Sequence, residues 1–220
     1  MNRATRFYQA AIGKKAVMGI TGLIGIGFVI GHMAGNLLVF RGPDAMNAYA
    51  HFLKSTGELL WIVRLVLITA VVLHVIAAWQ LTLQNRAARP VGYVDRKPQV
   101  TTFASKTMRW GGVILLLFIV LHILHFTTGT LRPSGFFDEA DVYGNVIASF
   151  RIWWVTLFYV IAMIALGLHL YHGAWSSVRS LGYAQPSKDP LHRRIALGIA
   201  VVVWLGFTAI PVAVFAGLIA

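Results

Sequence analysis

The segment LLWIVRLVLITAVVLHVIAAWQLTL, residues 59–83, decides the fold of this chain. It contains a single charged side chain, Arg64, and a single histidine, His74. A helix needs about 20 consecutive apolar residues to cross the hydrocarbon core of a bilayer. The segment therefore predicts a transmembrane helix that carries an imidazole close to the middle of the membrane.

Four further stretches have the same character, and proline, glycine and charged residues interrupt the sequence between them. Of the 220 residues, 58% are hydrophobic and only 12% are charged, a composition typical of integral membrane proteins. We therefore expect an all-α membrane protein with a single domain, residues 1–220. The predicted bundle has five transmembrane helices, at about 16–40, 59–83, 110–131, 152–178 and 195–219.

The formal net charge of +12 is distributed between the two sides of this bundle. Fourteen of the 19 lysines and arginines fall in the N-terminal segment and in the second and fourth connections. Cytoplasmic loops carry such an excess, so the N-terminus is predicted to be cytoplasmic and the C-terminus outside. Because the basic residues form no single patch, we expect no nucleic-acid partner, and some of them are expected to meet anionic lipid head groups.

Two connections on the predicted outer side are longer than a tight turn. Residues 43–57 predict a short interfacial helix, with Pro43 in its first turn and Met46, Tyr49, Phe52 and Leu53 on one face. Residues 133–150 are predicted to form an acidic outer loop with two adjacent aromatic residues, Phe136 and Phe137.

The chain contains no cysteine. It therefore cannot attach a c-type haem through thioethers, ligate a cysteine-bound iron–sulfur cluster or form a disulfide. Any iron–sulfur centre that works with this chain must belong to a partner.

Four of the predicted helices carry a histidine at depth, where ionisable side chains are costly. With a rise of 1.5 Å per residue, His32 lies about 13 Å and His122 about 15 Å from the predicted outer boundary. On the same basis, His74 lies about 18 Å and His169 about 15 Å from the predicted inner boundary. The four imidazoles thus form two layers, and each layer draws on two different helices.

This layering is typical of two b haems stacked across a membrane, each with two axial histidines. His32 and His122 would bind the outer haem iron, and His74 and His169 the inner one. Buried histidines also serve as helix-packing donors or proton relays, so that interpretation stays open. His125 and His172 follow two of these histidines by three residues. They could replace them as ligands, or bond a propionate or a quinone. Candidate propionate partners are Lys14, Lys15, Arg109 and Arg179.

Several stretches together resemble the cytochrome b subunit of succinate:quinone oxidoreductase, the five-helix, two-haem type that also serves fumarate reductases. They are HMAGN at 32–36, NAYAHFL at 47–53, His74, residues 109–122 and GLHLYHGAWS at 167–176. The resemblance covers essentially the whole chain. It implies that His32, His74, His122 and His169 are the axial ligands, paired first with third and second with fourth.

The resemblance also implies partners and a reaction. A flavoprotein subunit and an iron–sulfur subunit would lie on the cytoplasmic side and pass electrons from succinate, through the inner haem, to quinone. The quinone, more often menaquinone than ubiquinone, would bind near the outer haem of a protein in the prokaryotic cytoplasmic membrane. His51, Glu58 and Arg64 are candidates for the quinone site. For Glu58, the sequence favours the simpler role of an interfacial charge at a helix start.

Other functions remain open on the sequence alone. The same architecture would serve a fumarate reductase that oxidises quinol. A cytochrome b of a membrane hydrogenase or formate dehydrogenase has a different ligand spacing, and the bc type carries two histidines on each of two helices. A transporter with a histidine relay is an alternative of another class. A haem-free anchor for a soluble dehydrogenase would not need four ligand-like histidines.

Overall fold

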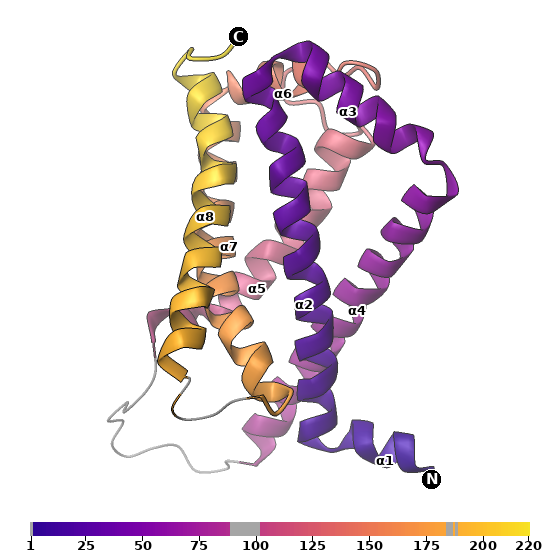
Figure 1. Ribbon diagram of the computed structural model, residues 1–220, viewed down its shortest axis with the longest axis vertical. Coiled ribbons are helices and arrows are strands. Elements are labelled where there is room, and N and C mark those ends of the chain that lie inside the picture. Colours follow the sequence, from indigo (N-terminus) through magenta and orange to yellow (C-terminus); the bar gives the residue numbers. More distant parts are fainter. Residues whose placement is uncertain (1, 89–101, 184–186, 188) are drawn as a thin grey trace.

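The computed structural model describes residues 2–88, 102–183, 187 and 189–220, and over these residues the chain is helical with no strand (Figure 1). The helices are α1 (Arg3–Gln9), α2 (Ala11–Asn36), the 3-10 helix η1 (Leu37–Arg41), α3 (Pro43–Ser55), α4 (Glu58–Ala87), α5 (Phe103–His122), the π-helical turn η2 (Ile123–Thr127), α6 (Val142–Phe150), α7 (Trp153–Ser180) and α8 (Asp189–Phe215).

Five helical stretches, two of which continue from an α-helix into η1 or η2, are long and apolar enough to cross a membrane, which confirms the all-α prediction. They are Ala11–Arg41, Glu58–Ala87, Phe103–Thr127, Trp153–Ser180 and Asp189–Phe215. The third span ends at Thr127 rather than near residue 131, because Gly129 takes a positive φ of 61° that a helix cannot continue through. Pro211 lies inside α8, as a membrane helix tolerates.

The two ends of the bundle differ. α1 and the N-terminus lie at one end, called here the N-terminal end. α3, α6 and the C-terminus lie at the opposite end, called the C-terminal end (Figure 1). The interfacial helix predicted at residues 43–57 is present as α3. Gly42, with φ of 92°, turns the chain after η1, and Pro43 occupies the first turn of α3. Met46 is buried, whereas Phe52 is 60% exposed.

The prediction of a loop over residues 133–150 is wrong for its second half, which forms α6. The Asp141 side chain caps α6 by accepting a hydrogen bond from the Gly144 N–H at 2.9 Å. It also accepts one from Asn47 Nδ2 of α3, at 2.9 Å. Val146, Ile147 and Phe150 are buried, so α6 packs its apolar side chains over the C-terminal end of the bundle.

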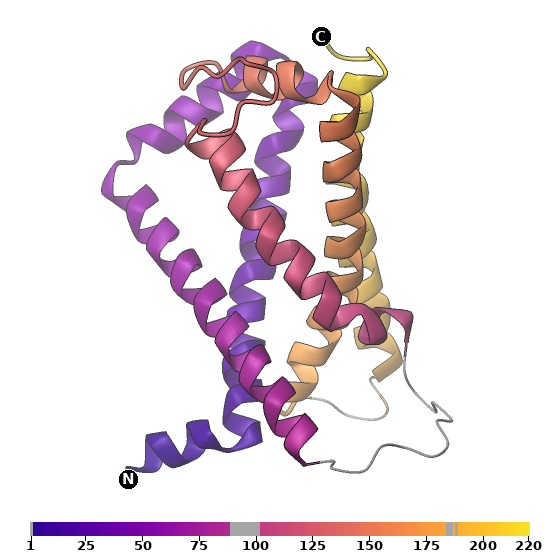
Figure 2. The same ribbon diagram turned by 180° about the vertical axis from the view of Figure 1, so that it is seen from behind.

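The helices do not pack evenly. α7 packs against α2, α5 and α8, while α4 packs against α2. Among the described residues, α4 makes no extensive backbone contact with α5 or α7, and α2 makes none with α5. α4 and α5 diverge from one another when seen from behind (Figure 2). The buried apolar clusters lie mainly between α7, α8 and the C-terminal end. Among the described residues, α4 therefore has its extensive helix contact with α2, and α5 has its own with α7.

Candidate functional site

Two pairs of histidines face one another across the bundle. The ring centroids of His32 on α2 and His122 on α5 are 5.8 Å apart, and the ring planes meet at 83°. The ring centroids of His74 on α4 and His169 on α7 are 6.1 Å apart, at 55°. In both pairs the rings bridge helices whose backbones do not pack together. The structure thus brings together the same two pairs that the depth argument forms.

The ring spacing fits a metal ion between the members of each pair. A metal–imidazole bond is about 2 Å and the ring centroid lies about 1 Å beyond the nitrogen, so two opposed imidazoles on one ion have centroids about 6 Å apart. Both observed separations are close to this value. Two imidazoles from opposite sides are the donor set of a six-coordinate b haem.

Hydrogen bonding at His74 leaves one ring nitrogen available. Thr21 Oγ1 lies 2.8 Å from the Val17 carbonyl and 3.1 Å from His74 Nδ1. A threonine hydroxyl has one proton, and a helical threonine commonly gives it to the carbonyl four residues earlier. The Thr21 oxygen then accepts from Nδ1–H of His74. In this tautomer Nε2 carries the free lone pair that a metal needs.

Small residues give a flat ligand room beside the pairs. Gly25 lies two helical turns before His32, on the same face of α2. A Cβ at Gly25 would meet no atom within 4 Å, although the residue is only half exposed. A Cβ at Gly22 would lie 3.5 Å from His74 Cε1, and one at Gly112 would lie 4.0 Å from His169 Cε1. His169 Nδ1 is buried without a hydrogen-bond partner among the described residues. These features fit a macrocycle between the rings.

The two additional histidines have other surroundings. His125 is buried, and both of its ring nitrogens have protein partners: Tyr159 Oη at 3.0 Å from Nδ1 and Ser149 Oγ at 2.9 Å from Nε2. His172 lies against Trp175, with ring centroids 5.9 Å apart. The structure therefore brings neither of them opposite another histidine within the described part of the chain.

The basic side chains predicted as propionate partners differ in availability. Lys14 Nζ is buried and donates to the Gln9 and Tyr8 carbonyls at 2.8 and 3.2 Å, so it fastens α1 to the start of α2. The Arg179 guanidinium lies 5.0 Å from the Trp175 ring centroid. Lys15 and Arg109 are exposed at the N-terminal end. Of the four candidates, Lys14 has the least freedom to reach a propionate.

The predicted quinone-site residues all lie toward the C-terminal end but do not form a cluster. His51 on α3 and Glu58 at the start of α4 are exposed. Arg64 is half-buried, with its guanidinium 5.0 Å from the Trp61 ring centroid. Among the described residues no hydrogen bond or ion pair joins the three side chains. A quinone there would have to bridge them itself.

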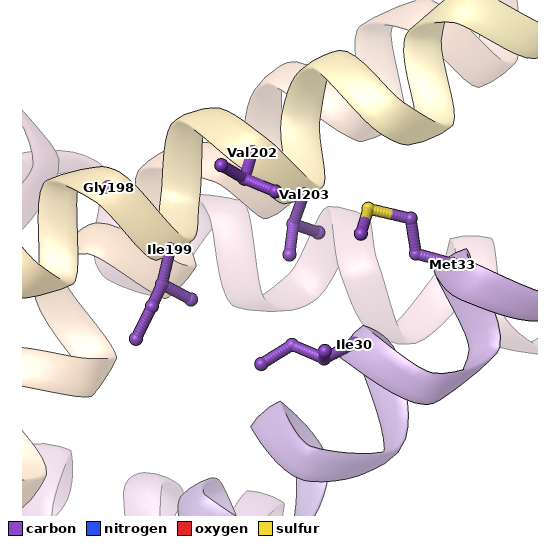
Figure 3. Close-up of a pocket in the computed structure, with 6 residues that line it drawn as sticks. All are labelled: Ile30, Met33, Gly198, Ile199, Val202 and Val203. Atoms are coloured by element: carbon purple, nitrogen blue, oxygen red, sulfur yellow. The ribbon is translucent and has the colours of Figure 1, made fainter.

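A groove of about 300 Å³ lies between α2 and α8 (Figure 3). Its lining is aliphatic apart from the Met33 thioether and a glycine; the six residues are Ile30, Met33, Gly198, Ile199, Val202 and Val203. None of these side chains donates a hydrogen bond, which a quinone carbonyl needs. The groove therefore does not fit a quinone ring.

Sequence reasoning missed the hydroxyl groups that contact the histidines. Thr21, Tyr159 and Ser149 are buried polar residues within or beside apolar helices. Their polarity in such segments was the available signal, because a buried hydroxyl needs a partner. Which histidine each would meet depends on how the helices are rotated against each other.

Five helices long and apolar enough to cross a membrane make this chain a multi-pass membrane protein, and two facing histidine pairs are a donor set that a membrane cytochrome b would use. Among curated proteins, the chain is similar to the succinate dehydrogenase cytochrome b558 subunit of Bacillus subtilis (strain 168). The two are 24% identical over 203 residues, which cover 90% of this chain and 92% of that protein. The resemblance to the cytochrome b subunit of succinate:quinone oxidoreductase is confirmed. No protein-family model matches the chain, and no solved structure matches it.

Proposed function

We propose that this chain is the membrane-anchor cytochrome b subunit of a succinate dehydrogenase, respiratory complex II. In this role it passes electrons from a partner iron–sulfur subunit, by way of two b haems, to a quinone in the membrane. The observation that carries the proposal is the pair of imidazole separations, 5.8 and 6.1 Å, between helices that do not otherwise pack together. The name of the Bacillus subtilis relative supports the same complex.

His32 and His122 would hold one haem, toward the C-terminal end, and His74 and His169 the other, toward the N-terminal end. Haem, when bound, supplies a one-electron carrier inside a medium that excludes free charge. The chain's own residues orient that carrier. Thr21 holds the His74 ring with Nε2 free, and the glycines at 22, 25 and 112 leave room beside the rings.

The proposed orientation follows the charges. The N-terminal end, richer in Lys and Arg, faces the cytoplasm in this proposal, in agreement with the positive-inside rule. The flavoprotein and iron–sulfur subunits would contact this end. The C-terminal end then lies outside the cytoplasmic membrane of a prokaryote. His51, Glu58 and Arg64 are the proposed donors and acceptors for the quinone, menaquinone in this proposal. A fumarate reductase that oxidises quinol would use the same sites in the reverse direction.

Counting haems tests the proposal. In the purified complex, we expect a reduced-minus-oxidised spectrum of b haem and two haems for each copy of this chain. The histidine-relay transporter predicts a colourless protein. One haem for each chain would contradict the assignment of two pairs, and none would contradict the cytochrome.

Thr21→Val is expected to weaken haem retention at the His74 site by about 10- to 100-fold, the usual cost of removing an outer-shell partner of a metal-bound histidine. The measurement is the haem-to-protein ratio of the complex during extended detergent washing. Thr82→Val is the matched control. Thr82 Oγ1 donates to the Ala78 carbonyl four residues earlier, at 2.8 Å, just as Thr21 does to Val17. Equal haem loss in the two variants would refute the role of Thr21.

A further inference from the structure

A chain of hydrogen bonds runs from His122 to α6, which covers the C-terminal end of the bundle. Tyr159 Oη lies 3.4 Å from His122 Nδ1 and 3.0 Å from His125 Nδ1. His125 Nε2 in turn lies 2.9 Å from Ser149 Oγ, on α6. Three elements, α5 with its π turn, α7 and α6, are thus joined by four side chains.

The chain is enclosed. Tyr159, His125 and Ser149 are buried, with 7%, 7% and 2% of their surfaces exposed. Phe126 stacks on the His125 ring at 4.0 Å between centroids. Phe118 and Phe150 meet the Tyr159 ring edge-on at 5.2 and 5.0 Å. Because aromatic side chains surround the polar atoms, each polar atom depends on the next one for its hydrogen bond.

The direction of the chain follows from the proton inventory. A phenol has one proton, and a neutral imidazole has one donor and one acceptor nitrogen. If His122 binds iron through Nε2, its Nδ1 carries a proton and donates to the Tyr159 oxygen. Tyr159 then donates its own proton to His125 Nδ1, which leaves His125 Nε2–H to donate to Ser149. The His122 and His125 N–H protons and the Tyr159 O–H proton each then have an acceptor.

The π turn gives this arrangement its geometry. Residues 123–127 form a wider turn than an α-helix, with bonds five residues apart. The wider turn moves His125 out of the α-helical register that it would otherwise share with His122. His125 therefore meets Tyr159 and Ser149, while His122 faces His32 at 5.8 Å. Single π turns of this kind occur frequently at functional sites.

We propose that Tyr159, backed by His125 and Ser149, is the positioning residue of the haem ligand His122 and tunes the haem held by His32 and His122. This inference rests on the proposed function, since it assigns a role to residues around a proposed ligand. By accepting a hydrogen bond from Nδ1–H, the Tyr159 oxygen makes the His122 imidazole a stronger electron-pair donor to a metal. A stronger donor stabilises oxidised iron, and so it lowers the midpoint potential of this haem and not of the other.

Tyr159→Phe tests the proposal in the assembled complex. The midpoint potential of one haem is expected to rise, by an amount equivalent to about a tenfold change in the ratio of reduced to oxidised haem, or about 59 mV for one electron. The other haem is expected to be unchanged, and both haems are expected to remain bound. Potentiometric titration of the visible spectrum and the spin-resonance signal of the oxidised haems are the readouts.

Tyr143→Phe is the matched control. Tyr143 packs against the same apolar cluster as Tyr159, and its hydroxyl donates to the Ala220 carbonyl at 2.9 Å. The control therefore loses a hydroxyl and a hydrogen bond without touching a histidine. A shift of equal size in both variants would show a general packing effect and would overturn the proposal.

Variants of His125 test the rest of the chain. His125→Leu removes the acceptor for Tyr159 and is expected to give a smaller rise in the same potential. His125→Asn retains an oxygen close to the position of Nδ1 and is expected to restore most of the original value. Ser149→Ala is expected to have the smallest effect. Loss of a haem in His125→Leu would make His125 a ligand and overturn this proposal.

The two proposals fail in different ways. If the unaltered complex contains no haem, the proposed function fails. If it contains two haems and His122→Ala loses one, but Tyr159→Phe shifts neither potential, only the role of Tyr159 is refuted.

Discussion

His74→Ala is expected to reduce the haem content of the complex from two to one for each copy of this chain. The ring centroids of His74 and His169 are 6.1 Å apart, so removal of either ring would leave the haem iron proposed for this site with one protein ligand. Quinone reduction with succinate is expected to fall by more than about 100-fold, because changing an outer-shell partner alone costs 10- to 100-fold. Haem is counted by pyridine haemochrome, and quinone reduction is followed with succinate as donor.

His172→Ala is the control for this variant. His172 lies on the same helix as His169, three residues further on, but its ring contacts Trp175 rather than a histidine. The control is expected to keep both haems. If His74→Ala keeps two haems, or if His172→Ala loses one, the assignment of the pair at the N-terminal end is wrong.

Double substitutions are expected to reveal which histidines share an iron. His32→Ala and His122→Ala should each remove one haem, and the double variant should remove no more than either single one, because both rings serve the same ion. His32→Ala combined with His74→Ala should remove both haems, because these rings belong to different pairs. The difference is a full haem per chain, measured on complexes with equal amounts of the partner subunits.

Partner subunits provide the control for folding. A variant whose helices fail to assemble would lose the iron–sulfur subunit from the membrane, whereas loss of one haem alone should leave it attached. If the His32→Ala and His122→Ala double variant lost two haems while a cross-pair double variant lost one, the pairing would be refuted.

The sequence predicted the membrane spans because their lengths and composition are local properties. A stretch such as residues 59–83 has no soluble structure that would hide so many apolar side chains, and the corresponding helix is α4. The depth of each histidine was also predictable, since the rise of a helix is constant. Depth alone sorted His32 with His122 and His74 with His169, and these are the rings that face each other.

Prediction from the local sequence pattern failed where long-range contacts determine the structure. Residues 142–150 were predicted as loop, yet Asp141 caps a helix there that buries Val146, Ile147 and Phe150 against other elements. The contacts of His125 could not be predicted from the sequence for a related reason. A π turn depends on hydrogen bonds that the sequence does not specify by spacing, and it separates His125 from the face of His122.

By itself, then, the sequence predicted five segments long and apolar enough to cross a membrane and the position of each imidazole along its helix, because both depend only on composition, length and the helical rise. Only the tertiary structure decided which side chains meet each imidazole. The rotation of one helix against another brings Thr21 to His74 and Tyr159 to His122. That rotation is set by the packing of whole helices, which no single segment contains.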